Sequence, residues 1–325
     1  MTLIGHDNAW RAWRDAMTSA RMHHAWILAG TKGLGKGLFA RAAAAELVRE
    51  AGIPQPDPAN HPDIIVLDHL PANDTEEEKK AEGKPYAVKR NITIDQIRRM
   101  QARLNTRPTL GSRRVVIIDP ADSLETASCN ALLKSLEEPP AGTFFLLVAH
   151  RPGRLLPTIR SRCRTLRFDP LPSDALDRIL RAETPDASAA TRAAAVAAAE
   201  GSPGAALDFV AQDLGALHAL MLRILAEGDH GFTLRGALAD EIGARPDRER
   251  QVAVCDLARA VIASQLMPSQ LMQGDRAAQA RVIAAHGELV RLGAQIPTYN
   301  FDPALVAMEI GGLLASAAMP REAAH

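Results

Sequence analysis

The chain has 325 residues, enough for two or three domains, and 47% of them are apolar. Basic and acidic residues both total 38, so the formal net charge is zero and no global field indicates a nucleic-acid partner. The N-terminus lacks a signal-peptide pattern, and no apolar stretch approaches the roughly 20 residues that span a bilayer. We therefore expect a cytoplasmic protein without a membrane partner.

Three cysteines, Cys129, Cys163 and Cys255, lie far apart and form no CxxC pair. This spacing argues against a zinc site and against a disulfide framework. We expect no bound metal, and we expect the cysteines to be small apolar residues of the core.

The first half of the chain alternates short apolar runs with helix-like segments. Trp10, Trp13 and Met17 have the spacing of a first amphipathic helix. Alternating strand and helix signals predict an α/β fold, with a parallel sheet flanked by helices on both faces. The predicted strands are 25–29, 64–67, 115–118, 144–148 and 166–168, and the predicted helices are 38–50, 93–104 and 127–138.

Changes in composition along the chain indicate where its domains and surface segments begin and end. Residues 71–90 are polar and charged and are predicted to form a mobile surface excursion. After Pro170 the strand signal disappears and only helix-like segments follow. We therefore predict an α/β domain over 1–168, a small helical lid over 169–210 and an all-α C-terminal domain over 211–325.

A glycine-rich loop follows the first predicted strand directly and leads into a helix. Strand, glycine loop and helix are the order that a phosphate-binding P-loop requires. In such a loop the backbone N–H groups surround phosphate oxygens, and Lys36 would reach the β- and γ-phosphates. The candidate nucleotide-binding residues of the loop are Gly30, Thr31, Lys32, Gly33, Leu34, Gly35, Lys36 and Gly37.

Two groups that ATP hydrolysis needs are missing from this loop and its partner strand. The residue after the P-loop lysine should be Ser or Thr, which ligates Mg²⁺, but here it is Gly37. Asp119 ends an apolar strand as a Walker-B aspartate does, yet Pro120 follows where an acid would polarise the attacking water. Asp122, two residues further on, would face elsewhere. We expect no hydrolysis, and two alternatives stay open: weak ATP or ADP binding without productive Mg²⁺, and a turn that binds no nucleotide.

Two further motifs carry a family resemblance. Residues 130–140 read NALLKSLEEPP, and residues 155–163 end in Ser-Arg-Cys. With the His-His-Ala-Trp run at 23–26, they resemble the AAA+ subunits of bacterial DNA polymerase III clamp loaders, in particular the delta-prime type. The resemblance is dense over 20–168. It implies that the last domain is a collar that holds a five-subunit ring together.

The resemblance also implies a role for one arginine. In this family the arginine of Ser-Arg-Cys crosses the subunit interface to the γ-phosphate bound by the neighbour, and here that residue is Arg162. A guanidinium suits this task because it stays charged and presents several donors. The alternative is that Arg162 forms an interface salt bridge.

The implied function is that of a non-catalytic stator subunit, which supplies an arginine finger in trans while the sliding clamp is loaded onto primed DNA. The implied partners are gamma/tau-type ATPase subunits and a delta-type subunit in a hetero-pentamer, with primer–template DNA bound through the complex. Whether this chain contacts the clamp directly stays open.

Two rival functions are considered. One rival is an ATP-hydrolysing motor subunit of the same loader, and the other is a stand-alone DNA-repair P-loop ATPase. Gly37 and Pro120 argue against the motor subunit. The Ser-Arg-Cys motif argues against the stand-alone ATPase, because its arginine needs a neighbouring subunit.

The sequence departs from the family pattern at two places. Relatives often carry four zinc-binding cysteines between the first P-loop helix and the second strand, but the corresponding loop, 52–61, contains none, so no zinc is expected. Gly204 stands where active subunits hold a phosphate-sensing arginine.

Two groups of charged side chains lie outside these motifs. Arg98, Arg99 and Arg103 share the helix after Thr93 and are candidates for DNA-phosphate contact, with a solvated basic face as the alternative. Glu137 and Glu138 are expected to stabilise a helix end or to face water. Further arginines near the basic helix are Arg107, Arg113 and Arg114.

Overall fold

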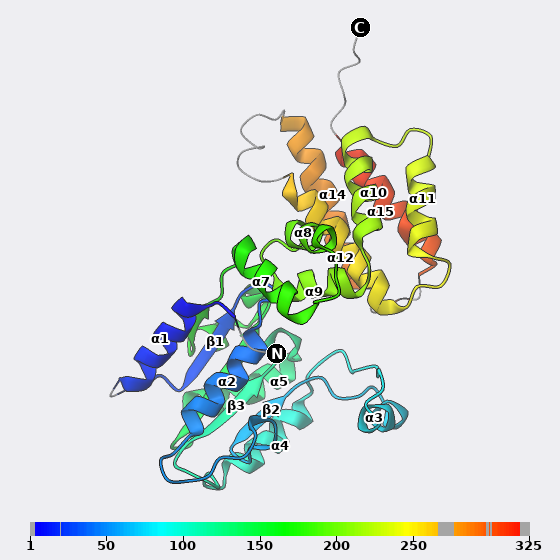
Figure 1. The fold of residues 1–325 in the computed structure, drawn as a ribbon. Coiled ribbons are helices and arrows are strands. Elements are labelled where there is room, and N and C mark those ends of the chain that lie inside the picture. Colours follow the sequence, from blue (N-terminus) through cyan, green and yellow to red (C-terminus); the bar gives the residue numbers. More distant parts are fainter. Residues whose placement is uncertain (1–3, 20, 266–275, 297–298, 300, 319–325) are drawn as a thin grey trace. The chain divides into compact units, whose positions relative to one another are not determined.

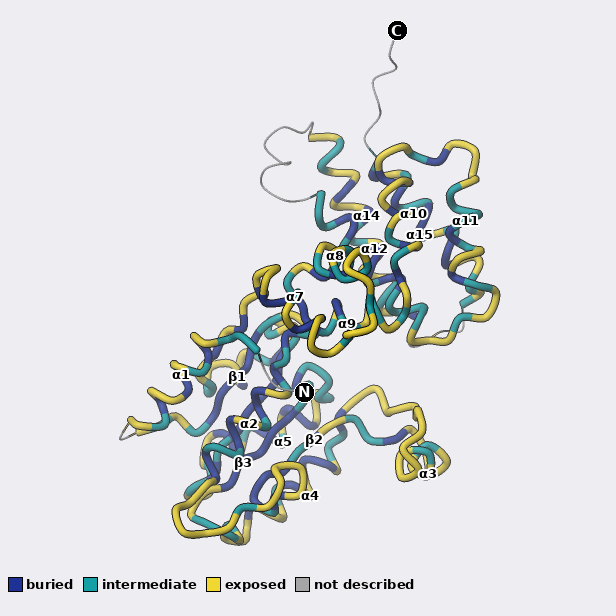
Figure 2. The backbone as a smooth tube through the Cα atoms, viewed as in Figure 1, coloured by how far each residue is buried: buried dark blue, intermediate teal, exposed yellow. Residues whose placement is uncertain are grey.

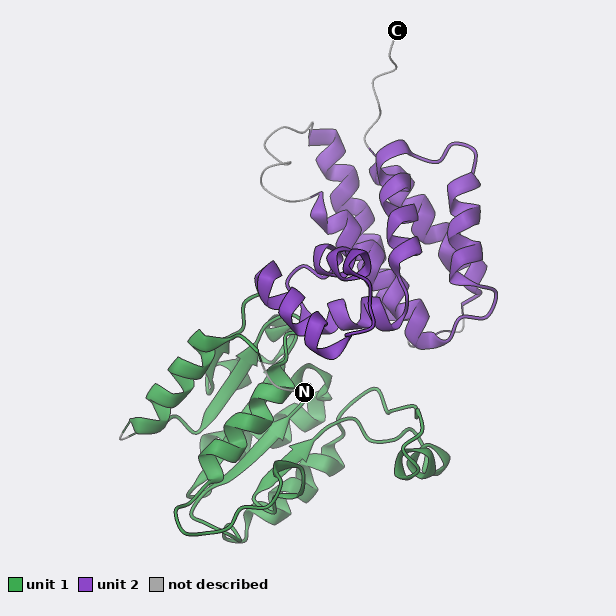
Figure 3. Ribbon diagram, viewed as in Figure 1, with its two compact units in different colours: residues 1–171 green, residues 172–325 purple. Residues whose placement is uncertain are grey.

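The computed structural model forms two units, residues 1–171 and residues 172–325 (Figure 3). The first unit contains every strand that the structure describes, and the second is helical over its described residues. The structure describes residues 4–19, 21–265, 276–296, 299 and 301–318.

A five-stranded parallel sheet is the centre of the first unit (Figure 1), as the alternating pattern predicted. Its strand order is β2-β3-β4-β1-β5, so the strand before the glycine loop lies between β4 and β5. Every residue of the three inner strands is buried except Phe144 of β4, which is partly buried, and this explains why the strands appear in the sequence as apolar runs (Figure 2). The strands are β1 (Ala25–Ala29), β2 (Ile64–Leu67), β3 (Arg114–Ile118), β4 (Thr143–Ala149) and β5 (Arg164–Arg167).

Two apolar cores cover the two faces of the sheet. Because side chains alternate along a strand, Trp26 and Leu28 of β1 pack with α1 and α2, whereas Ile27 packs with α4, α5 and α6. The helices of this unit are α1 (Asp7–Thr18), α2 (Lys36–Val48), α3 (Asp74–Ala81), α4 (Ile94–Leu104), α5 (Thr126–Glu137) and α6 (Pro157–Arg160), and the 3₁₀ turns are η1 (Pro58–Asn60), η2 (Ala121–Ser123) and η3 (Pro152–Arg154).

Capping explains where two of these helices begin. A capping box begins α4, with Thr93 N–H donating to Gln96 Oε1 at 3.0 Å. The prediction for residues 71–90 was wrong in missing α3. Asn73 caps this helix by accepting from Glu76 N–H at 3.0 Å, and none of the helix is buried, so it has no apolar period by which a sequence reading could find it.

The second unit contains a group of three short helices and a group of longer ones. The short helices α7, α8 and α9 pack against one another, and α8 also contacts α10 and α12. Helices α10, α11, α12 and α14 all pack on the apolar α15. The division into lid and collar stays a prediction. The helices are α7 (Ser173–Glu183), α8 (Ala189–Ala198), α9 (Pro203–Ala211), α10 (Gly215–Glu227), α11 (Thr233–Ile242), α12 (Arg248–Ser264), α14 (Arg276–Gln295) and α15 (Pro303–Ala317).

None of the described helices is by itself both long and apolar enough to cross a membrane. Helices α9 and α10 meet those criteria only as a pair, across a bend of 107°.

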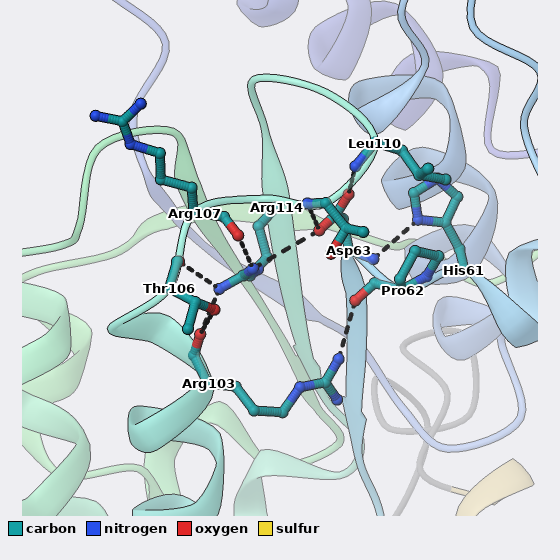
Figure 4. A network of polar contacts seen from close by, with 9 residues as sticks. His61, Pro62, Asp63, Arg103, Thr106, Arg107, Leu110 and Arg114 are labelled. Carbon is teal, nitrogen blue, oxygen red and sulfur yellow. Dashed lines mark hydrogen bonds and ion pairs between the residues drawn. The ribbon is translucent and has the colours of Figure 1, made fainter.

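A buried polar network joins β2 and β3 to the end of α4 (Figure 4). Asp63 and Arg114, whose side chains are 1% and 5% exposed, form an ion pair of 3.7 Å. The Asp63 carboxylate also accepts from the N–H groups of Thr109 and Leu110 at 2.7 and 2.8 Å. The Arg114 guanidinium donates to the main-chain carbonyls of Arg103, Thr106 and Arg107.

Replacing Asp63 by Ala should lower the free energy of unfolding of the first unit by about 3–5 kcal/mol, because Arg114 is left buried without its counter-charge. Urea unfolding followed by tryptophan fluorescence measures this unit alone, since all three tryptophans, Trp10, Trp13 and Trp26, lie in it. The matched control is Asp95→Ala, which removes a 71% exposed carboxylate and should cost less than about 1 kcal/mol. Equal losses for the two variants would contradict the assignment.

Candidate functional site

The glycine loop has the geometry that the sequence predicted, lying between β1 and α2. Gly33 and Gly35 adopt positive φ of 84° and 77°, which favour glycine, and Gly35 is the residue before the first turn of α2. Gly30 lies against the end of β5, where a Cβ would stand 2.6 Å from the carbonyl oxygen of Phe168. The loop therefore directs the amino end of a helix to the carboxyl edge of the sheet, the arrangement in which backbone N–H groups bind phosphate.

Lys36 is folded into its own loop. Its side chain is buried, and Nζ donates to the carbonyl oxygen of Thr31 at 2.5 Å. Burial lowers the pKa of Lys36 to about 8, and the negative charges of Asp119 and Asp122 only partly oppose this effect. A phosphate ligand would have to draw the ammonium group away from Thr31.

Asp119 occupies the space beside Gly37. A Cβ built on Gly37 would overlap Oδ2 of Asp119, so the carboxylate stands where the metal-binding Ser or Thr of an active P-loop would begin. Burial raises the pKa of Asp119, and the negative charge of Asp68 adds to this effect. The Asp119 carboxylate thus lies where a side chain at position 37 would begin.

The Asp122 carboxylate accepts hydrogen bonds from the main chain. Its carboxylate accepts from His150 N–H at 2.8 Å and from Arg151 N–H at 3.1 Å, just beyond the end of β4. Two amide donors therefore fix this group to the loop after β4, and it takes no place beside Pro120 as an acid for water activation.

The sequence analysis missed His150, the first residue after β4. Burial and then the positive charge of Lys36 lower its pKa to about 4, so the imidazole is neutral at physiological pH. Its Nδ1 is buried without a hydrogen-bond partner within the described part of the chain. Its position at the carboxyl end of a strand next to β1 is the signal that could have indicated it.

Arg162 lies on the surface between α6 and β5. Nη2 forms an ion pair of 2.5 Å with Oε1 of Glu137, and Nη1 donates to the carbonyl oxygen of Thr158 at 2.9 Å. The Arg162 side chain is 35% exposed, so part of the guanidinium is open to solvent. Glu137 ends α5 and its side chain is 47% exposed, in line with the expectation, and the ion pair with Arg162 is an additional contact that the sequence did not predict.

Arg162 and the glycine loop lie at opposite edges of the sheet. Arg164, two residues after Arg162, is paired with Trp26 near the start of β1, whereas the loop follows the end of β1 at Ala29. Three residues of strand correspond to roughly 10 Å, and Arg162 lies further back along the chain. Its guanidinium therefore cannot serve the nucleotide site of its own chain.

All three DNA-contact candidates of the basic helix α4 are exposed. Arg98 forms an exposed ion pair of 3.5 Å with Asp95, and Arg99 Nε donates to the carbonyl oxygen of Asp95 at 3.3 Å. Arg103 donates to the carbonyl oxygen of Pro62 at 2.9 Å, so its guanidinium is tied to the protein. Arg114 lies near this helix, as the sequence predicted, but its side chain is buried and donates to the carbonyl oxygen of Arg103.

The cysteines are free thiols. Cys129 and Cys255 are buried, as expected, and Cys163 is half-buried against the core of α4 and α5. Burial raises the pKa of Cys163 to about 12, so the thiol beside Arg162 stays protonated and unreactive at neutral pH. Among the described residues, no group of three His, Cys, Asp or Glu side chains is placed to hold a metal ion.

Residues 5–172 match the model of the family described as "DNA polymerase III, delta subunit". The chain belongs to this family. The resemblance inferred from the two sequence motifs is thereby confirmed, together with the α/β P-loop fold. The matched residues cover the first unit, and both the glycine loop and Arg162 lie within them.

Individual relatives agree with this assignment. The delta-prime subunit of DNA polymerase III from Pseudomonas aeruginosa is 35% identical over 209 residues, covering 59% of this chain and 58% of the relative. The delta-prime subunit from Escherichia coli is 42% identical over 124 residues, or 38% of this chain and 36% of the relative. The tau subunit from the same organism is 31% identical over 161 residues, covering 50% of this chain and 24% of tau. The chain thus matches only about a third to three-fifths of the length of these delta-prime relatives.

Among solved structures, a DNA polymerase III gamma subunit-related protein from Thermotoga maritima is similar to this chain, and the match covers 95% of this chain and 99% of the Thermotoga protein. It is 20% identical, with a TM-score of 0.48.

The lowered pKa of Lys36 predicts a stability that depends on pH. Between pH 8 and about 10.5 the folded lysine is largely neutral while the unfolded one is protonated, so unfolding takes up a proton. The free energy of unfolding of the wild type should therefore rise with pH relative to Lys36→Met, by up to about 1.4 kcal/mol per pH unit. Urea unfolding at matched pH values measures the difference, with the exposed Lys84→Met as control. A difference that does not change with pH would contradict the burial of the charge.

Proposed function

We propose that this chain is a non-catalytic stator subunit of a DNA polymerase III clamp loader that supplies Arg162 in trans to a neighbouring ATPase subunit. The observation that carries the proposal is the placement of Arg162 at the edge of the sheet opposite the glycine loop. An exposed guanidinium so far from its own loop, in a protein of this family, is best explained by a phosphate on another chain.

The state of the chain's own nucleotide site supports the same proposal. Hydrolysis needs a metal ligand and a group that positions water. At the first place Asp119 lies over Gly37, and at the second Pro120 offers neither a carboxylate nor a donor. The loop binds ATP or ADP weakly at most, without productive Mg²⁺, and no cofactor or zinc is required for the stator role.

The partners in this proposal are gamma/tau-type ATPase subunits and a delta-type subunit in a hetero-pentamer, with α10 to α15 forming the collar. Primer–template DNA would bind through the complex during clamp loading in the cytoplasm. Arg98, Arg99 and Arg103 are the candidates for DNA contact, since all three are exposed and each makes one contact within the protein. Each phosphate contact that is lost should reduce the salt dependence of DNA binding by about one unit of the logarithmic slope.

The similarity to tau and gamma subunits supports a second candidate function, an ATP-hydrolysing motor subunit of the same loader. A steady-state ATPase assay on the isolated chain separates the two. We expect no turnover above that of Lys36→Ala. Turnover that Lys36→Ala abolishes would favour the motor role, and a persistent monomer with tight DNA affinity would favour a stand-alone repair ATPase.

Arg162→Ala should lower the rate of ATP hydrolysis at the adjacent site by about 10³-fold or more, because trans arginine fingers contribute roughly 10³–10⁵. The measurement is single-turnover ATP hydrolysis, with primed DNA and clamp present, by a reconstituted loader in which only the adjacent site retains its P-loop lysine. Arg160→Ala removes an exposed guanidinium two residues away and should leave the rate within about twofold. A near-normal rate for Arg162→Ala would remove the finger assignment.

A further inference from the structure

Glu137 occupies a position that helix stability does not explain. It is the last residue of α5, which ends before Pro139 and Pro140. A negative charge at the carboxyl end of a helix is unfavourable, since the last carbonyl groups are already electron-rich. The carboxylate instead meets the guanidinium of Arg162 at 2.5 Å.

The guanidinium has two anchor points that come from different elements. Nη2 is held by Glu137 at the end of α5, and Nη1 is held by the carbonyl oxygen of Thr158 in α6. An arginine has five N–H donors in one plane. Because Nη1 also donates to Ser161 Oγ at 3.4 Å, the donors that remain available are Nε–H and the second hydrogen of Nη2. Those free donors form the part of the group that a phosphate can contact.

Fixing a long side chain before it meets its ligand lowers the entropic cost of the contact. A free arginine carries about 2 kcal/mol of rotamer entropy, and a charge-assisted hydrogen bond to a carboxylate restricts it more strongly than a neutral bond does. The rate of a reaction depends steeply on the placement of such a group.

We propose that Glu137 is a positioning residue for Arg162, which holds the guanidinium in one orientation for the γ-phosphate on the neighbouring subunit. This inference rests on the proposed function of Arg162. It assigns a task to Glu137 that Glu138 does not share, because Glu138 forms no ion pair with any residue that the structure describes.

The charge and the geometry of Glu137 can be tested separately in the reconstituted loader with one active site. Glu137→Ala should lower the single-turnover rate constant about tenfold, with the apparent ATP affinity unchanged. Glu137→Gln should stay within about threefold of wild type, because its amide oxygen can accept the same hydrogen bond from Nη2. The control Glu138→Ala, an exposed carboxylate one residue away, should have no effect.

A double-mutant cycle distinguishes positioning from a merely structural effect. In an Arg162→Ala background, Glu137→Ala should lower the rate no further, since the group that it positions is gone. If Glu137→Ala lowered the rate equally in the wild-type and Arg162→Ala backgrounds, the inference would be overturned. An increase in rate for both Glu137→Ala and Glu137→Gln would also overturn it, because it would show that the carboxylate competes with phosphate for Arg162. If Arg162→Ala lowers the rate and Glu137→Ala does not, the positioning role alone fails. If Arg162→Ala has no effect, the proposed function fails and this inference with it.

Discussion

The parallel direction of the five strands is the constraint on which the rest of this site depends. In a parallel sheet all carboxyl ends share one edge and all amino ends share the other. The glycine loop follows β1 and therefore lies at the carboxyl edge, whereas the turn that carries Arg162 precedes β5 and lies at the amino edge. Because β1 and β5 are adjacent and in register, the two functional elements are fixed a strand length apart, and no side-chain rotation can bring them together.

Two charged side chains at the candidate nucleotide site form hydrogen bonds within the protein. Lys36 donates to Thr31, Asp119 lies over Gly37, and Asp122 is bound by two amide groups after β4. Lys36 and Asp122 thus have hydrogen-bond partners within the protein. Such partners compensate for burial, since a buried charge without one is costly. Restoring a hydroxyl at position 37 would therefore also require Asp119 to move.

The arginines show how differently one residue type is used. Arg114 is buried among carbonyl groups and an aspartate and holds the end of α4 to the sheet, while Arg98 stays exposed. Arg162 lies between these extremes, anchored on one side and exposed on the other. A group held in this way combines a fixed orientation with access for a ligand, which is what an action on a neighbouring chain requires.

The sequence by itself determined the order of strands and helices, the glycine loop, the absence of a hydroxyl at Gly37 and the Ser-Arg-Cys motif. These features are local: apolar period, turn residues and a few adjacent positions define them. The polar helix α3 could not be found in this way, because it buries no residue and has no apolar period. Only the tertiary structure decided that Arg114 is buried, that His150 lies near Lys36, and that Glu137 meets Arg162. Each of these contacts joins residues from different elements, and strand order and packing, rather than neighbouring sequence, bring such residues together.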